Sequence, residues 1–103
     1  MTSGVTMDWL MEDAIEPGAG LSLARMTVAP GTTTEAHRHT YCTETVHLLS
    51  GCVEQRRGDE WLALNPGDTV LIPRNSVHQT RNASAEPAVL IIAYSSGARA
   101  YEA

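Results

Sequence analysis

The sequence lacks several features that mark whole classes of protein. It has no phenylalanine, and its 7 basic residues face 12 acidic ones, giving a net charge of −5. Nucleic-acid binding depends on clustered Lys and Arg, yet the one basic pair, Arg56-Arg57, is closely followed by Asp59 and Glu60. The best apolar stretch, 89–94, is far shorter than the ~20 residues of a membrane-spanning helix. We therefore expect neither a nucleic-acid partner nor a membrane.

Length and cysteine content bound the organisation further. With 103 residues, the chain has room for one hydrophobic core, so we predict a single domain over 1–103. The first residues carry no Lys or Arg and are interrupted by acidic residues, which does not fit a signal peptide. We therefore expect a cytoplasmic protein in which Cys42 and Cys52 stay reduced rather than forming a disulfide.

Glycine and proline punctuate the chain at short intervals, which predicts short strands. Eight such short strands are typical of an all-β sandwich or barrel. Residues 8–15 fit either a short helix or an added N-terminal strand. The expected strands are 21–28, 32–39, 44–49, 52–56, 61–64, 69–72, 77–81 and 88–94.

The histidines suggest a metal site. His37 and His39 are two positions apart, so on a strand both imidazoles lie on one face. Two imidazoles on one face form a natural edge of a metal site. Taken alone, the pair fits two exposed histidines on a polar strand better than it fits a metal site.

The residues around this pair carry a resemblance. Residues 31–51 read GTTTEAHRHTYCTETVHLLSG and residues 67–82 read GDTVLIPRNSVHQTRN. They resemble the two motifs of the cupin superfamily, G-x5-H-x-H-x3,4-E-x6-G and G-x5-P-x-G-x2-H-x3-N. One signature position differs, because Asn75 stands where glycine is expected; asparagine also tolerates a positive φ and can make the same turn. The resemblance implies a double-stranded β-helix, a small jelly-roll-like barrel.

The resemblance also implies a ligand set for one divalent metal ion per chain, made of His37, His39, Glu44 and His78. Three neutral nitrogens and one carboxylate leave positions for water or substrate. Such a set suits Fe, Mn, Ni, Cu, Co or Zn, and affinity order alone does not choose among them.

Three further residues are candidates for catalysis. Tyr94 is expected to be a polar group in the cavity, and Glu35 lies near the histidine pair. Cys42 shares strand parity with Glu44 and is a candidate for the mouth of the site, where a thiol could react; an unreactive turn cysteine is the favoured interpretation. We expect His47 on the outer face and Cys52 in the packing.

Strand parity also predicts which side chains share the cavity with the metal. The expected set is mostly apolar and comprises Ala24, Met26, Val28, Val46, Leu48, Val70, Ile72, Thr80, Leu90, Ile92 and Tyr94, with Asn82 as a further candidate. On the first long strand Arg25 and Thr27 are the alternative to the apolar set, and all these residues could instead simply fill the barrel.

Two functions fit these features. The first is a metal-dependent enzyme for a small organic molecule, with dioxygenase-like or lyase- or isomerase-like chemistry. The alternative is a non-catalytic module that binds or senses a small metabolite.

The N-terminal extension, 1–20, predicts a homodimer. Met7, Trp9 and Met11 share one face if the segment is extended, and they are costly to leave in water. They either cover the chain's own barrel or join the edge of a partner's sheet, which would remove an exposed edge.

Overall fold

A computed structural model describes residues 3–98, and these form nine strands and no helix, so the expected all-β class is confirmed. The strands are β1 Val5–Met11, β2 Ser22–Val28, β3 Thr32–Thr33, β4 Glu44–Ser50, β5 Val53–Arg57, β6 Glu60–Leu64, β7 Thr69–Ile72, β8 His78–Asn82 and β9 Ala88–Tyr94.

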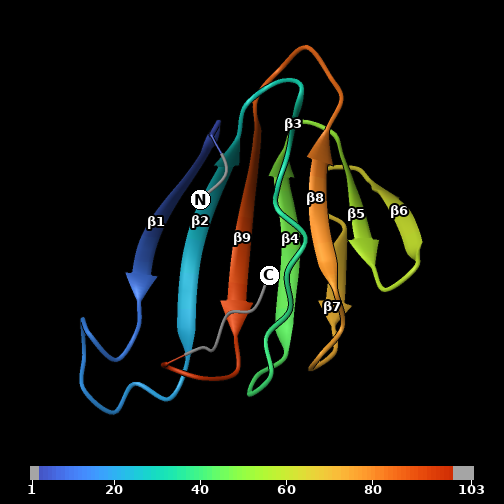
Figure 1. Cartoon of the computed structure of the whole chain (residues 1–103). Helices are drawn as coiled ribbons and strands as arrows, with labels where there is room; N and C mark the ends of the chain where they lie inside the picture. Colours follow the sequence, from blue (N-terminus) through green and yellow to red (C-terminus); the bar gives the residue numbers. More distant parts are fainter. Residues whose placement is uncertain (1–2, 99–103) are drawn as a thin grey trace.

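The strands form two antiparallel sheets. One has the order β1-β2-β9-β4-β7 and the other the order β3-β8-β5-β6, so the chain crosses repeatedly between them (Figure 1). On β4, Glu44, Val46 and Leu48 are buried while the residues between them face outward. This alternation places the core between the sheets, and its members include Val28, Leu48, Val53, Leu64, Leu90 and Ile92.

The N-terminal segment settles an alternative that the sequence left open. β1 covers Val5–Met11 and pairs with β2, with Met7 opposite Met26 and Trp9 opposite Ala24. Apolar residues at alternate positions favour this strand over a helix, because one face can then pack on the barrel. The helical alternative for 8–15 is wrong, since β1 extends to Met11 and residues 13–18 form turns and a bend.

The largest departure from the expected strands is the segment 32–39. Regular pairing with β8 stops at Thr33, and the backbone beyond it is irregular apart from an isolated bridge between His37 and His78. The prediction that His37 and His39 belong to a regular strand is therefore wrong. The two imidazoles still come together, because this bridge holds the irregular segment against β8.

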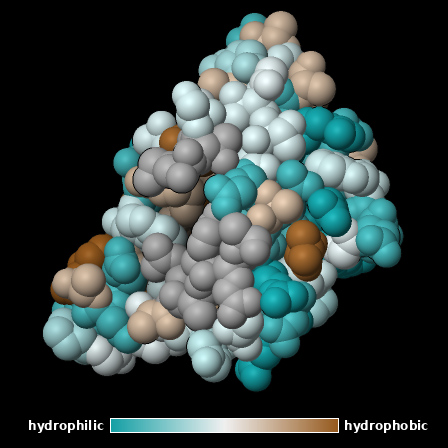
Figure 2. Space-filling view, viewed as in Figure 1, coloured by the Kyte–Doolittle hydropathy of each residue, from teal (hydrophilic) through white to brown (hydrophobic). Residues whose placement is uncertain are grey.

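The face of the molecule that Figures 1 and 2 show carries both hydrophilic and apolar residues. Hydrophilic residues cover the side where β5 and β6 lie, and apolar residues show as small separate spots (Figure 2). No stretch of residues 3–98 forms a helix with the length and apolar character needed to cross a membrane.

Candidate metal centre

Four side chains from separate parts of the chain converge at one point. His37 and His39 come from the irregular segment after β3, Glu44 begins β4, and His78 begins β8. One ligand atom from each lies within 4.8 Å of the other three. His39, Glu44 and His78 are buried, with exposures of 3–5%, while His37 is half-buried.

Backbone hydrogen bonds hold the two motifs together. The amide of His37 donates to the carbonyl of His78 over 3.2 Å, and the amide of His78 donates to the carbonyl of His37 over 2.9 Å. The amide of Asn75 donates to the carbonyl of His39 over 2.9 Å. Asn75 has a φ of 67°, so it makes the left-handed turn expected at the position where the motif has glycine.

The imidazoles of His37 and His78 are oriented by their outer nitrogens. Nδ1 of His37 lies 2.8 Å from the carbonyl oxygen of Glu35, and Nδ1 of His78 lies 3.1 Å from that of Ser76. A carbonyl oxygen only accepts, so each Nδ1 carries the proton and donates it. The lone pair of each Nε2 is then available for a metal ion, an arrangement usual for metal-bound histidine.

The contacts of Glu44 give a test of whether a cation fits. Its Oε1 lies 3.1 Å from Nε2 of both His39 and His78. Within the described residues, Glu44 Oε1 and His78 Nε2 are buried and make no hydrogen bond of acceptable geometry. Buried polar atoms are nearly always satisfied, and a shared cation would satisfy these. Metal–ligand distances are about 2.0–2.2 Å, so the four donors would need only a small inward movement.

The same contacts shift the pKa values. Burial raises the pKa of Glu44, but its contacts with His39 and His78 outweigh that and lower it to about 2. Burial lowers the pKa of His78, but the Glu44 carboxylate outweighs it, so this pKa is raised. Burial and the charge of His78 lower the pKa of His37. Glu44 is therefore a carboxylate at neutral pH, ready to bind a cation.

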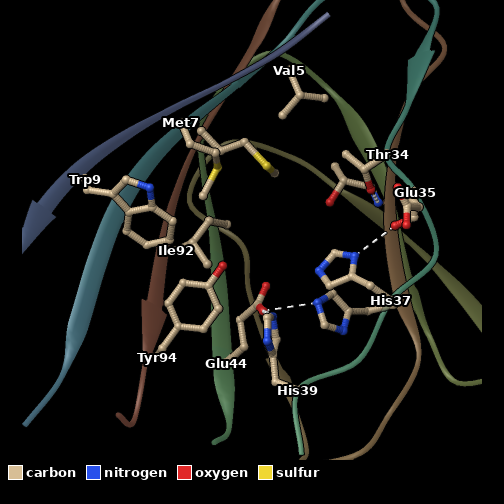
Figure 3. Close-up of a pocket in the computed structure, with 13 residues that line it drawn as sticks. Val5, Met7, Trp9, Thr34, Glu35, His37, His39, Glu44, Ile92 and Tyr94 are labelled. Carbon is tan, nitrogen blue, oxygen red and sulfur yellow. Dashed lines mark hydrogen bonds and ion pairs between the residues drawn. The ribbon is translucent and has the colours of Figure 1, made fainter. Parts of the chain in front are cut away.

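A cavity of about 310 Å³ opens beside the four residues. Figure 3 shows Val5, Met7 and Trp9 of β1 on one side of this cavity and Thr34 and His37 on the other. Tyr94 lies directly opposite Glu44 on neighbouring strands, and its hydroxyl points toward the Glu44 side (Figure 3). The arrangement combines a cation site with a largely apolar chamber that can exclude water from a small molecule.

Sequence comparison identifies the family. The profile of the cupin domain matches residues 24–94, more than half of the chain. The chain belongs to the cupin family. Two curated relatives are a xanthan biosynthesis protein, XanB, of Xanthomonas campestris pv. campestris (strain B100), 34% identical over 83 residues, and germin-like protein 3-8 of Oryza sativa subsp. japonica, 30% identical over 82 residues. The alignments cover 81% and 75% of this cupin but only 18% and 36% of those proteins.

Solved structures agree on the fold. A cupin-2 domain protein from Rhodospirillum rubrum is 26% identical, with a TM-score of 0.84 over 96% of this chain and 64% of its own. Oxalate oxidase in complex with glycolate is 23% identical, with a TM-score of 0.87 over 96% of this chain and 54% of its own. The likeness to oxalate oxidase shows the fold alone.

Only some of the residues predicted for the cavity of this cupin line it. Met26, Thr80, Ile92 and Tyr94 do. The other predicted members lie outside the cavity lining and fill buried positions; they are Ala24, Val28, Val46, Leu48, Val70, Ile72, Asn82 and Leu90. Strand parity names the residues that point inward, but it does not say at which end of the barrel space is left.

The structure places the other candidates as follows. Glu35 lines the cavity and is exposed. Cys42 is 1% exposed within the core and is not among the cavity-lining residues, so the candidate position at the mouth is wrong. His47 lies outside the four-residue group, with its Nδ1 2.7 Å from the hydroxyl of Thr69. No disulfide joins the two cysteines, and Cys52 is exposed rather than packed as expected.

Sequence reasoning missed several functional neighbours. Val5, Met7 and Trp9 line the cavity. The sequence predicted only that apolar residues of the N-terminal segment cover the chain's own barrel or join a partner's sheet. Thr34 also lines the cavity, three positions before His37, the first expected metal ligand. No local signal in the sequence places these residues at the cavity, because each reaches it only through pairing with β2 or β8.

Proposed function

We propose that this cupin is a metal-dependent enzyme that acts on a small organic molecule, with dioxygenase-like or lyase- or isomerase-like chemistry. The observation that carries the proposal is the buried three-histidine and one-carboxylate cluster opening onto a cavity of about 310 Å³. Pockets of this size suit small molecules. Because the chain spans only 18% of XanB and 36% of the germin-like protein, their activities are not carried over.

In this proposal His37, His39, Glu44 and His78 hold one divalent ion, which is Fe, Mn, Ni, Cu, Co or Zn. A bound ion of this kind supplies Lewis acidity, and Fe or Cu adds redox chemistry with O2. The carbonyl contacts of His37 and His78 keep their Nε2 atoms aimed at that point, so little reorganisation is needed on binding.

Proton transfer is assigned to Tyr94 and Glu35. Tyr94 is 7% exposed and sits opposite Glu44, so its phenol can hold or pass a proton beside a bound substrate. Glu35 lies at the exposed rim of the cavity and can exchange protons with solvent. Cys42 is left out of the machinery, because the core surrounds it.

The apolar wall completes the site. Met7, Trp9 and Ile92 line the cavity across from the histidines, and their side chains displace water from the apolar part of a substrate. Excluding water strengthens the polar interactions within the site. A small-molecule partner with an apolar body therefore fits this chamber. The homodimer and the cytoplasmic location expected from the sequence stay predictions.

Metal analysis followed by reconstitution tests this proposal. Metal-free protein would be loaded separately with Fe, Mn, Ni and Zn, then screened for oxygen consumption and for turnover of small organic acids, enols and sugars. Tyr94→Phe is the matched variant, because it removes the hydroxyl and keeps the ring. Metal-dependent turnover that Tyr94→Phe lowers without loss of metal supports the enzyme. Protein that binds metal and small molecules but is inert with every metal would favour the non-catalytic binding module.

A further inference from the structure

Two threonines lie side by side on the wall of the cavity. Thr34, just after β3, and Thr80 of β8 both line it. The amide of Thr34 donates to the carbonyl of Thr80 over 2.9 Å, and the amide of Thr80 donates to the hydroxyl of Thr34 over 2.9 Å. Both are at most 9% exposed, so their hydroxyls are held in a fixed, dry place.

The hydroxyl proton of Thr80 is already used in a hydrogen bond within the protein. Gln55 is fully buried, and its Nε2 donates to the carbonyl of Arg56 over 3.2 Å. This contact fixes the direction of the amide, because a carbonyl only accepts. Oε1 of Gln55 then faces the Thr80 hydroxyl at 2.6 Å and accepts its proton. Thr80 therefore presents only lone pairs to any further partner.

The hydroxyl of Thr34, by contrast, still has its proton available. Its oxygen accepts the hydrogen bond from the Thr80 amide. Among the hydrogen bonds of residues 3–98, none is donated by this hydroxyl, and its proton can turn toward a ligand. The wall thus offers one acceptor and one donor from adjacent side chains. An alcohol or phenol O–H satisfies both with a single oxygen atom, since it donates and accepts at once.

The rest of the cavity narrows the ligand further. The described lining residues include no Arg or Lys, and Val5, Met7, Trp9, Met26 and Ile92 form its apolar part. A substrate with several negative charges would find no cation here besides a bound metal. Thr80 follows His78 by two residues on one face of β8, which separates their Cα atoms by about 6–7 Å. One aromatic ring spans a distance of this order.

From these contacts we infer that Thr34 and Thr80 form a hydroxyl-recognition site, and that the substrate is a largely apolar molecule with a metal-binding oxygen at one end and a hydroxyl group at the other. This inference rests on the proposed function, because the metal must hold the first end. Thr34 and Thr80 are positioning residues for binding rather than groups that carry out the reaction.

Binding of simple aromatic acids to the cobalt-loaded protein tests the inference. Titration calorimetry would compare benzoate with 3- and 4-hydroxybenzoate and with 3- and 4-methoxybenzoate, and the visible cobalt spectrum would report whether the carboxylate reaches the metal. We expect at least one hydroxybenzoate to bind about 3- to 10-fold more tightly than benzoate. The matching methoxybenzoate should lose that gain, because its oxygen cannot donate to Thr80.

Variants assign the effect to the two threonines. Thr80→Val and Thr34→Val should each bring the affinity for the hydroxybenzoate close to that for benzoate, whereas Thr80→Ser should keep most of the gain. Thr45→Val, on the outward face of β4, is the matched control and should change nothing. Thr80→Val removes the donor to buried Gln55 and can impair folding, so the comparison of probes on the unaltered protein carries the test by itself.

The outcomes separate this inference from the proposed function. Equal binding of benzoate and its hydroxy derivatives, with the cobalt spectrum shifted by both, would overturn the hydroxyl site and leave the metal site standing. A cobalt-loaded protein that binds none of the probes would also overturn the hydroxyl site, and only a protein that takes up no cobalt would overturn the proposed function as well.

Discussion

The two sides of the cavity are built in different ways. The polar side is formed by His37, His39, Glu44 and His78, which the resemblance to the cupin motifs already marks as a group. The apolar side is formed by Val5, Met7 and Trp9 of an edge strand, which belong to neither motif. Metal coordination needs a particular atom at a particular place, whereas an apolar wall needs only volume and shape. The residues of the polar side are therefore strongly constrained, whereas those of the apolar side can change as long as their volume and shape are kept.

The most severe test of this comparison removes one metal ligand. His78→Ala should reduce the metal content from about one ion per chain to nearly none, because the remaining donors no longer enclose the ion. Elemental analysis after dialysis would measure it. His47→Ala is the matched control and should keep the native content, since His47 contacts Thr69 instead. Equal losses in the two variants would refute the ligand assignment.

Acid should empty the polar side next. Imidazole binds metal only when neutral, with an unperturbed pKa of about 6.5. In the metal-free protein the pKa of His78 is raised by Glu44, whose own pKa is about 2. The proton on His78 therefore competes with the metal, while Glu44 stays charged across the range. Metal affinity should therefore begin to fall already above pH ~6.5, and it should fall about tenfold or more for each pH unit below that value. Full occupancy at pH 3 would contradict a site dominated by histidine.

Truncating the apolar wall should affect stability and leave the metal in place. Trp9 is half-buried and packs on the core and near Tyr94, with ring centroids 5.9 Å apart. Trp9→Ala should lower the free energy of unfolding by about 1–3 kcal/mol, measured by urea denaturation. The control is Leu10→Ala, since Leu10 is 48% exposed on the other face of β1; we expect a change within about 0.5 kcal/mol. Loss of metal from Trp9→Ala would show that the two sides are not independent.

A smaller effect on stability is expected at the turn of the second motif, which is hydrogen-bonded to the first motif. Asn75 has a φ of 67° and donates to the carbonyl of His39. Asn75→Ala should destabilise the protein by about 1 kcal/mol, because alanine tolerates this backbone less well. Asn75→Gly should be within about 0.5 kcal/mol of the native protein. Thermal unfolding would measure both, and a stable alanine variant would mean that this turn is not under strain.

β1 is also expected to join two copies of the chain. Val5, Met7 and Trp9 pack on the chain's own core, while β1 lies at the edge of its sheet. The unpaired side of an edge strand favours pairing with a second copy. Light scattering at high micromolar concentration should give a dimer mass, and deletion of residues 1–12 should give a monomer. A monomeric native protein, or an unchanged dimer after the deletion, would rule out pairing through β1.

Much of the fold and of the polar side followed from sequence alone. The alternation of apolar residues and the turn residues predicted the strands, and β7 and β9 have the expected bounds. The resemblance to the cupin motifs implied the four residues that converge, and Asn75 takes the positive φ expected of it. These features are local, or depend on spacing along the chain, and so they can be read without coordinates.

Only the tertiary structure decided what surrounds the polar side. The segment after Thr33 leaves the regular ladder, Cys42 enters the core, and Cys52 is exposed. β1 closes the cavity, and Thr34 meets Thr80 through backbone hydrogen bonds. Periodicity along a strand shows which side chains point inward. It does not show where two sheets diverge enough to leave space, because that depends on residues far apart in the chain packing against each other.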